Sequence, residues 1–138
     1  MRSRKSGWYV FAAAALLVAA PALAQDTRPL VGLWVGDVAE QLENEISHYR
    51  MYVTIDVDRR GNPVAAVHYS LECTGIWTGA QQSDRIWRFE ETITSGRANC
   101  ASHADGELVP EGDTLRVRFH PVGYPDQLAQ AVLRRIAQ

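Results

Sequence analysis

Short runs of alternating apolar and polar side chains follow one another along most of the chain after residue 30. In the clearest run, apolar residues occupy every second position from Tyr49 to Val57, with mostly polar residues between them. Such a period of two is typical of β-strands that bury one face. Eight runs predict strands over residues 30–38, 48–58, 64–73, 75–79, 85–95, 105–109, 115–120 and 129–136. The composition of the last run also permits a helix, but its place after seven strands favours a closing strand.

Clusters of turn-forming residues separate the runs at positions 59–62, 80–84, 95–99 and 110–113. The polar, acidic segment 39–47 fits either a helical turn or a long loop. Short strands with turns at this spacing are typical of an antiparallel meander, and closure into a barrel removes the exposed sheet edges. We therefore predict an all-β fold, a small antiparallel meander barrel of lipocalin-like type, with a two-sheet β-sandwich as the alternative.

The runs 48–58 and 64–73 together predict a hairpin. Inward residues face inward residues across it only if the loop around residues 60–62 has an odd length. In such a register Glu72 lies opposite Arg50 or His48, which would form a cross-strand pair of opposite charge.

The first 24 residues have the pattern of a secretory signal peptide. Arg2, Arg4 and Lys5 precede an apolar stretch, and Ala22-Leu23-Ala24 offers a small-x-small cleavage site. The apolar stretch is too short to favour a transmembrane anchor. We expect cleavage after Ala24, a single domain over residues 25–138, a periplasmic or secreted location, and no stable membrane insertion after cleavage.

The mature domain is acidic. Removing the three basic residues of the signal peptide from the 14 in the chain leaves 11 against 16 acidic ones, a net charge of about −5. An acidic domain without a basic run is a poor partner for nucleic acids or anionic membranes, because both need clustered positive charge. The composition therefore argues against nucleic-acid binding.

Cys73 and Cys100 are the two cysteines of the chain. Exported proteins mature in oxidising compartments, so we expect these cysteines to form a disulfide. A cross-link over a loop of this length stabilises a fold by about 3–4 kcal/mol. Neither cysteine lies in a Cys-x-x-Cys pattern or at a helix start, which argues against redox chemistry.

Glu91 is the acid in an unexpected place. It shares one strand face with Trp87, Phe89 and Ile93, so it points into the core if the aromatic residues do. A lone buried carboxylate must be paired, hydrogen-bonded or protonated. One interpretation is that Glu91 anchors a ligand in the barrel, in a cavity shared with Tyr69 and Trp87, with Trp77 at the barrel mouth. The other is a structural partnership with Arg134 or Arg135, Tyr69 or backbone donors.

Other chemistry has little support in the sequence. The predicted register separates His48 and His68 by more than about 10 Å, and His103 and His120 are isolated, so no metal site is expected. There is no Gly-x-Ser-x-Gly motif, and Glu90 and Glu91 face opposite sides of one strand, which excludes a carboxylate dyad. We expect no cofactor and identify no catalytic residue.

The segment Gly32-Leu33-Trp34 resembles the Gly-x-Trp signature of lipocalins and related calycin barrels. In that family the tryptophan closes one end of the barrel and an arginine late in the chain packs over it. The resemblance implies structural roles for Trp34 and for Arg134 or Arg135. The chain is shorter than most lipocalins and lacks an evident C-terminal helix after the barrel.

Residues 69–75 read Tyr-x-Leu-x-Cys-x-Gly, residues 91–96 read Glu-x-Ile-x-x-Gly, and Cys100 follows. With Leu133-Arg134 near the end, this string resembles a poorly characterised bacterial extracytoplasmic domain, which occurs alone behind signal peptides or appended to larger proteins such as kinases. The resemblance covers most of residues 32–135 and implies no activity and no catalytic residue.

Three functional hypotheses follow. The first is non-catalytic binding of a small, partly apolar molecule inside the barrel. The second is a protein-binding role, as an inhibitor, an immunity factor or an envelope-associated accessory protein, through the loops 39–47 or 121–127. The third is an enzyme of unknown reaction. The expected partners are thus a small-molecule ligand or an envelope protein.

Overall fold

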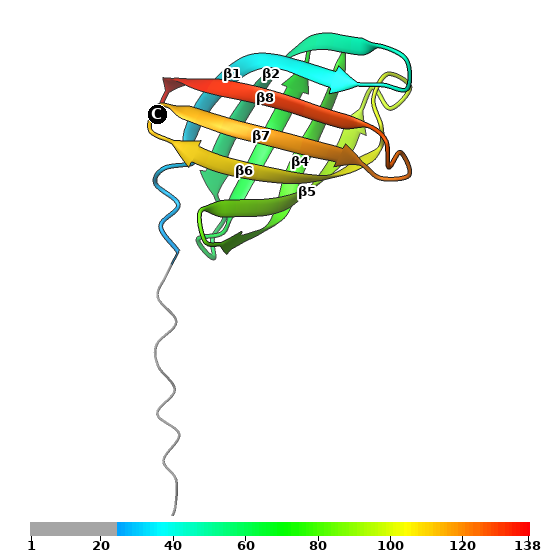
Figure 1. Ribbon diagram of the computed structural model, residues 1–138. Coiled ribbons are helices and arrows are strands. Elements are labelled where there is room, and N and C mark those ends of the chain that lie inside the picture. The colour runs from blue at the N-terminus through cyan, green and yellow to red at the C-terminus, as the bar shows by residue number, and fades with distance from the viewer. Residues whose placement is uncertain (1–24) are drawn as a thin grey trace, which may run out of the picture.

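A computed structural model describes residues 25–138 as eight antiparallel strands in one closed barrel (Figure 1). The strands are β1 (Gly32–Gln41), β2 (Ile46–Val57), β3 (Pro63–Tyr69), β4 (Cys73–Ser83), β5 (Ile86–Ser95), β6 (His103–Glu111), β7 (Thr114–Pro121) and β8 (Leu128–Ala137). Each strand pairs with the next along the chain, and β1 also pairs with β8 to close the ring. The predicted all-β meander barrel is confirmed, and the alternative sandwich is not observed. The predicted signal peptide, residues 1–24, lies outside the described residues.

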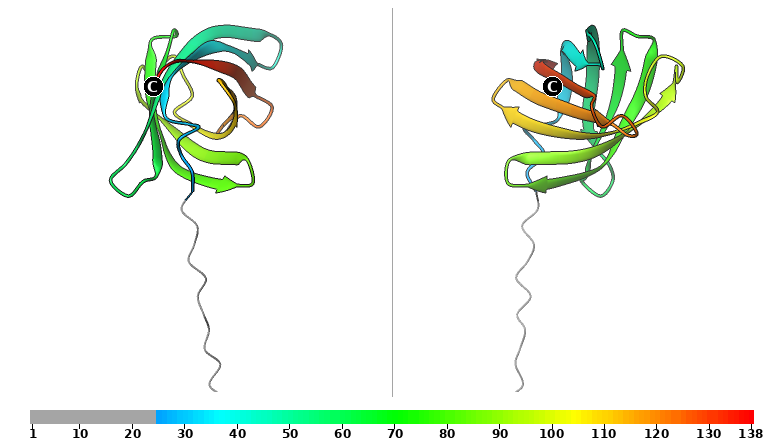
Figure 2. Two further views of the ribbon diagram at one scale, coloured as in Figure 1. Left: turned by 90° about the vertical axis from the view of Figure 1, so that its left-hand side faces the viewer. Right: turned by 45° about the vertical axis from the view of Figure 1, so that its right-hand side comes forward.

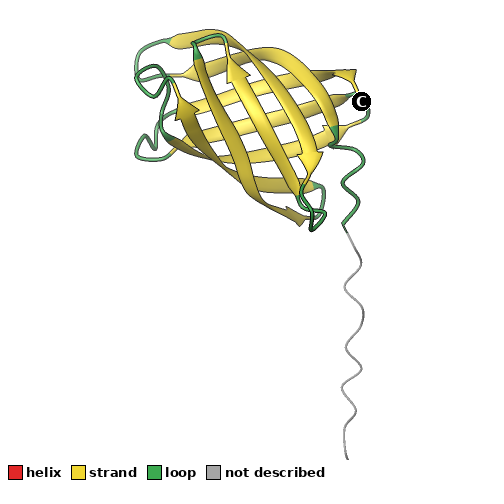
Figure 3. Cartoon of the chain, turned by 180° about the vertical axis from the view of Figure 1, so that it is seen from behind, coloured by secondary structure: helices red, strands yellow, loops and turns green. Residues whose placement is uncertain are grey.

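The closed ring leaves no strand with an unpaired edge among the eight (Figure 3). Residues 25–138 contain no helix with the length and apolarity needed to cross a membrane.

The alternating sequence pattern sets the two faces of the barrel wall. In β2, Met51, Val53 and Ile55 are buried, and the residues between them are exposed. The loop between β2 and β3 spans residues 58–62, an odd number, and Val57 pairs with Pro63 as the hairpin prediction requires. Inward residues of all eight strands form one continuous core.

Two polar segments are largely strands: residues 39–47, predicted as a helical turn or a long loop, and residues 80–84, predicted as a turn. β1 continues to Gln41, which pairs with Ile46, so the turn is only residues 42–45 rather than 39–47. β4 continues through Gln81 and Gln82 to Ser83, so the predicted turn at 80–84 is wrong as well. Backbone pairing extends these strands through polar residues, so the apolar alternation no longer marks them.

The predicted strand 64–73 is instead the end of β3, a turn and the start of β4. β3 ends at Tyr69, and Glu72 in the following turn has a positive φ of 63°. Glu72 is therefore not opposite Arg50 or His48, and that predicted charge pair is wrong. The carboxylate partner of Arg50 is Asp37 on β1, with Nε 2.9 Å from Oδ1.

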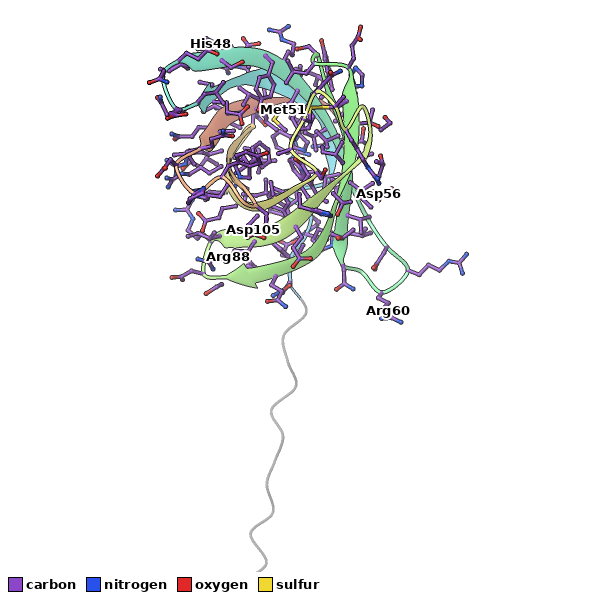
Figure 4. All side chains as sticks on the ribbon, turned by 90° about the vertical axis from the view of Figure 1, so that its right-hand side faces the viewer. His48, Met51, Asp56, Arg60, Arg88 and Asp105 are labelled. Carbon is purple, nitrogen blue, oxygen red and sulfur yellow. A yellow bond between two sulfur atoms is a disulfide. The ribbon has the colours of Figure 1, made fainter. Side chains whose placement is uncertain are left out.

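The two ends of the barrel differ. In a meander, successive turns alternate between ends, so the β1–β2, β3–β4, β5–β6 and β7–β8 turns share one end, which we call the mouth. The chain leader and the C-terminus lie at the opposite, closed end (Figure 1; Figure 2, left). Figure 4 looks into the mouth and shows Met51 inside the ring of strands, and Arg60 at the tip of the projecting β2–β3 hairpin.

Candidate functional site

A pocket of about 470 Å³ occupies the mouth half of the barrel. Its walls come from the mouth ends of the strands and from all four mouth turns. Its apolar lining includes Leu42, Leu71, Ala104, Phe119 and Ala129. Two of these inward positions, Ala104 on β6 and Ala129 on β8, carry the smallest apolar side chain. Small side chains at these positions leave room for the pocket, whereas Leu108 and Leu133, further along the same strands, are buried in the core.

Glu91 lies on the floor of this pocket and is buried, with 6% of its surface exposed. The Tyr69 hydroxyl donates to its Oε2 atom, and the Trp77 indole Nε1–H donates to the same atom over 2.7 Å. No group in residues 25–138 donates a hydrogen bond to Oε1. Every side-chain oxygen that is sealed from solvent in this part of the chain has a hydrogen-bond partner. Oε1 has none, so it is not sealed and is open to the pocket.

Burial raises the pKa of Glu91, and the nearby Glu40 carboxylate raises it further. The hydrogen bonds from Tyr69 and Trp77 act in the opposite direction, because they stabilise the ionised form, but burial dominates. A carboxyl group whose pKa is raised at the base of a pocket is typical of binding and catalytic sites.

A stack of aromatic rings supports the floor. The Trp77 ring stacks on Phe89, with centroids 4.3 Å apart. Phe89 in turn covers Gly106 on β6, where an added Cβ would lie 2.1 Å from the ring carbon Cζ. The absence of a side chain at residue 106 therefore lets Phe89 lie against the wall, and Phe89 supports the indole that reaches Glu91.

The disulfide between Cys73 and Cys100 is confirmed, and it joins the β5–β6 loop to the start of β4 at the rim. Asn99 Nδ2 donates to the Leu71 carbonyl over 3.0 Å. Gly96 has a positive φ of 69°, and a Cβ there would lie 2.2 Å from the Glu72 carbonyl oxygen. Only glycine fits that position. These contacts hold the loop 96–101 as a fixed wall of the pocket.

Tyr49 and Glu40 complete the polar lining on the β1–β2 side. The Tyr49 ring meets the Tyr69 ring edge-on, with centroids 5.7 Å apart. Burial raises the pKa of the Tyr49 phenol well above its usual value, and the Glu40 carboxylate contributes in the same direction. Arg97, on the opposite wall, donates from Nε to the Ile93 carbonyl over 3.1 Å.

The closed end is sealed by other residues of the predicted set. Arg135 lies over the Trp34 ring, with Cζ 4.3 Å from its centroid, and donates to the Pro29 carbonyl over 2.8 Å and to the Val31 carbonyl. Trp34 is fully buried, and its Nε1–H donates to the Leu30 carbonyl over 2.8 Å. Arg134 is exposed. Of the two candidate arginines, Arg135 therefore holds the position over the tryptophan.

The predicted ligand-binding residues separate into three positions. Glu91 and Tyr69 line the pocket. Trp77 is buried beneath it, as a donor to Glu91, and does not line a mouth surface. Trp87 does not line the pocket either, because it pairs with Leu108 close to the β4–β5 turn at the closed end.

Several lining residues were not predicted from the sequence, among them Glu40, Tyr49, Arg97, Ala104 and Ala129. Tyr49 had a signal in the sequence, since it is the inward residue nearest the mouth in its run. The two alanines had a weaker signal, since the small size of an inward residue is the only sign in the sequence that it borders a hollow.

All four histidines are exposed. No group of three or more His, Cys, Asp or Glu within residues 25–138 is arranged to hold a metal ion.

A scan against protein-family models and a search of curated proteins both return no match. Among solved structures, the chain is similar to Rv2717c from M. tuberculosis, with 16% identity and a TM-score of 0.42. The similarity covers 78% of this chain and 92% of that one. A likeness at this level adds nothing to the barrel topology described above, and the lipocalin-like assignment stays a prediction.

Proposed function

We propose that this protein is an exported, non-catalytic binding protein that holds a small, partly apolar molecule in the mouth of its barrel. The observation that carries the proposal is the Glu91 carboxylate, whose Oε1 atom is open to a pocket of about 470 Å³ while Oε2 is held by two donors. Pockets of a few hundred cubic ångströms whose walls combine apolar side chains with polar groups that orient a ligand are typical of small-molecule sites.

The fixed geometry of the floor supports binding. Tyr69 and Trp77 orient the carboxylate, and the disulfide-linked loop fixes the opposite wall. A ligand would therefore meet a preformed site and lose little free energy in ordering it.

Export is the second part of the proposal. The disulfide is typical of proteins from an oxidising compartment outside the cytoplasm. Together with the signal-peptide pattern of residues 1–24, it supports a periplasmic or secreted location.

Native mass spectrometry of the protein, exported from its full chain and purified under oxidising conditions, tests the proposal. We expect a bound small molecule on the wild type, and its loss in Ala129→Leu, which fills the pocket. Glu90→Gln, an exposed neighbour of Glu91 on the outer face, is the matched control and should keep the molecule. A bare wild-type protein that also binds nothing from an extract of its compartment would contradict the proposal.

A second candidate is protein binding through the mouth rim. Ile46, Val122 and Tyr124 lie in or beside the β1–β2 and β7–β8 turns and are each more than half exposed. Exposed apolar side chains grouped at one end are typical of interaction sites. Co-purification of an envelope protein with the wild type, abolished by Val122→Ser with Tyr124→Ser but retained in Ala129→Leu, would favour this function over the first.

A further inference from the structure

We infer that the pocket selects an organic cation: an ammonium group carried on an aromatic or aliphatic body. This inference rests on the proposed function and names the chemical class of its ligand.

The free oxygen of Glu91 calls for a donor. Tyr69 and Trp77 both donate to Oε2, which leaves Oε1 as the acceptor presented to the pocket. An ionised carboxylate accepts hydrogen bonds and donates none. A ligand group that reaches the floor must therefore bring a hydrogen to Oε1, and a charged donor gives the stronger and shorter bond.

No basic side chain in the described part of the chain forms an ion pair with Glu91. The titratable groups that line the pocket are Glu40, Glu91, Arg97 and three tyrosines, Tyr49, Tyr69 and Tyr124. Arg97 Nε already donates to the Ile93 carbonyl, and its side chain is largely exposed at the rim. Two carboxylates thus face one rim guanidinium, and a cationic ligand would supply the counter-charge that the buried carboxylate lacks.

The walls around the floor suit an apolar body. Ala104, Phe119 and Ala129 form one side, and the rings of Tyr49 and Tyr69 form the other. A carboxylate beside aromatic rings is a favourable environment for an ammonium group, because the ring faces add their own attraction for a cation. The net negative charge of the domain favours the approach of cations as well.

The opposite ligand class has a different signature. A protonated Glu91 would donate from Oε1 to a carbonyl or carboxylate of the ligand, and binding would then weaken as the pH rises. An ammonium ligand requires the ionised form of Glu91, so its affinity should increase with pH through the raised pKa of that group. The direction of the pH dependence therefore separates the two classes.

The test uses three probes with one skeleton: 2-phenylethylamine, 2-phenylethanol and phenylacetate. Binding to the oxidised wild-type protein is measured by NMR, from the methyl signals of Ala104 and Ala129, between about pH 5 and pH 8. We expect the amine to bind with a Kd of about 1 mM or tighter. It should bind about tenfold or more tightly than the alcohol, because the hydrogen bond is to a charged partner. The amine affinity should rise with pH.

Glu91→Gln keeps the shape of the floor but removes the charge. Its carbonyl oxygen can accept from Tyr69 and Trp77, so an amide NH2 donor then faces the pocket in place of the acceptor Oε1. We expect this variant to bind the amine about tenfold or more weakly than the wild type, and its affinity for the alcohol to change by less than about threefold. Glu90→Gln on the outer face is the control and should change neither. If Glu91→Gln does not fold, the pH profile of the wild type and the order of the three probes still test the inference.

Two failures can be told apart. If phenylacetate or the alcohol binds in the pocket as tightly as the amine, or if Glu91→Gln leaves the amine unaffected, the ligand class is wrong while the binding function stands. If no probe shifts the Ala104 and Ala129 methyl signals, both the class and the proposed function lose their support.

Discussion

Arg135 lies with its guanidinium carbon 4.3 Å from the centroid of the Trp34 ring, although the two residues are at opposite ends of the domain sequence. The same guanidinium donates to the carbonyls of Pro29 and Val31. It therefore joins the last strand to the chain leader across the closed end of the barrel. Arg134, its neighbour in sequence, is exposed and makes none of these contacts.

This difference makes the two arginines a matched pair. We expect Arg135→Ala to lower the free energy of unfolding by about 2 kcal/mol, because it removes a cation–π contact and two hydrogen bonds from a half-buried site. Arg134→Ala should change it by less than about 0.5 kcal/mol. Urea unfolding of both variants measures the difference, and equal losses would show that the closed end does not depend on Arg135.

The burial of Glu91 predicts a specific pH dependence of stability. Its pKa in the folded protein is raised above the ordinary 4.5, so the folded state holds the proton more tightly than the unfolded state. The stability from this group is complete below that value and is lost as the pH rises through the raised pKa. Glu91→Gln removes this dependence, since the amide does not titrate.

We therefore expect the free energy of unfolding of Glu91→Gln to rise relative to that of the wild type as the pH increases from about 4 to about 8. The comparison must be between proteins, because Asp37 and Asp58 have lowered pKa values and act in the opposite direction. Urea unfolding across this pH range measures the difference in free energy of unfolding between variant and wild type. A difference that is constant with pH, as we expect for Glu90→Gln, would contradict the burial of an ionisable Glu91.

The disulfide should contribute much of the stability of this small barrel. Cys73 and Cys100 are 27 residues apart in sequence, and linking them removes about 3–4 kcal/mol of chain entropy from the unfolded state. We expect urea unfolding of the wild type to show that reductant lowers the free energy of unfolding by an amount of that order. The double variant Cys73→Ser with Cys100→Ser should match the reduced wild type and show no response to reductant. An unchanged midpoint on reduction of the wild type would contradict the prediction.

Gly106 should prove essential to the pocket floor. A methyl group at this position would overlap the Phe89 ring, so we expect Gly106→Ala to cost about 1–3 kcal/mol. Phe89→Leu removes the clash. The free energy of unfolding of the double variant should therefore fall by clearly less than the sum of the decreases in the two single variants. Chemical unfolding of the four proteins in this cycle gives the coupling energy. Strictly additive losses would show that the ring does not rest on the glycine.

The strand interiors were predictable from the sequence because burial imposes a period of two on them. Residues 49–55 and 87–93 lie in strands with the inward faces that the pattern predicts, although Val57 at the end of the first run is exposed. The strand ends were not predictable, because Gln41 and Gln82 are polar residues that pair through their backbones and so do not continue the apolar alternation. The β3–β4 turn was missed for a related reason: Leu71 continues the apolar alternation through a turn.

Part of the site was also predictable. Glu91 could be recognised as an inward acid among aromatic residues, and Tyr69 as a residue that shares its cavity. The hollow itself could not be recognised, since it depends on small residues such as Ala104 and Ala129, which meet from strands distant in sequence. The same limit explains Trp87: its face was predictable, but its depth along the barrel axis depends on the register of all eight strands.

The most direct measurement is the titration of the Glu91 side-chain carboxyl carbon by NMR, in the free protein and after addition of 2-phenylethylamine. We expect a pKa above the ordinary value of 4.5 in the free protein, because the group is buried at the pocket floor. We expect a lower pKa once the amine is bound, because the ammonium stabilises the ionised carboxylate. An ordinary pKa that the amine leaves unchanged would contradict both the burial of Glu91 and its role as the anchor of the site.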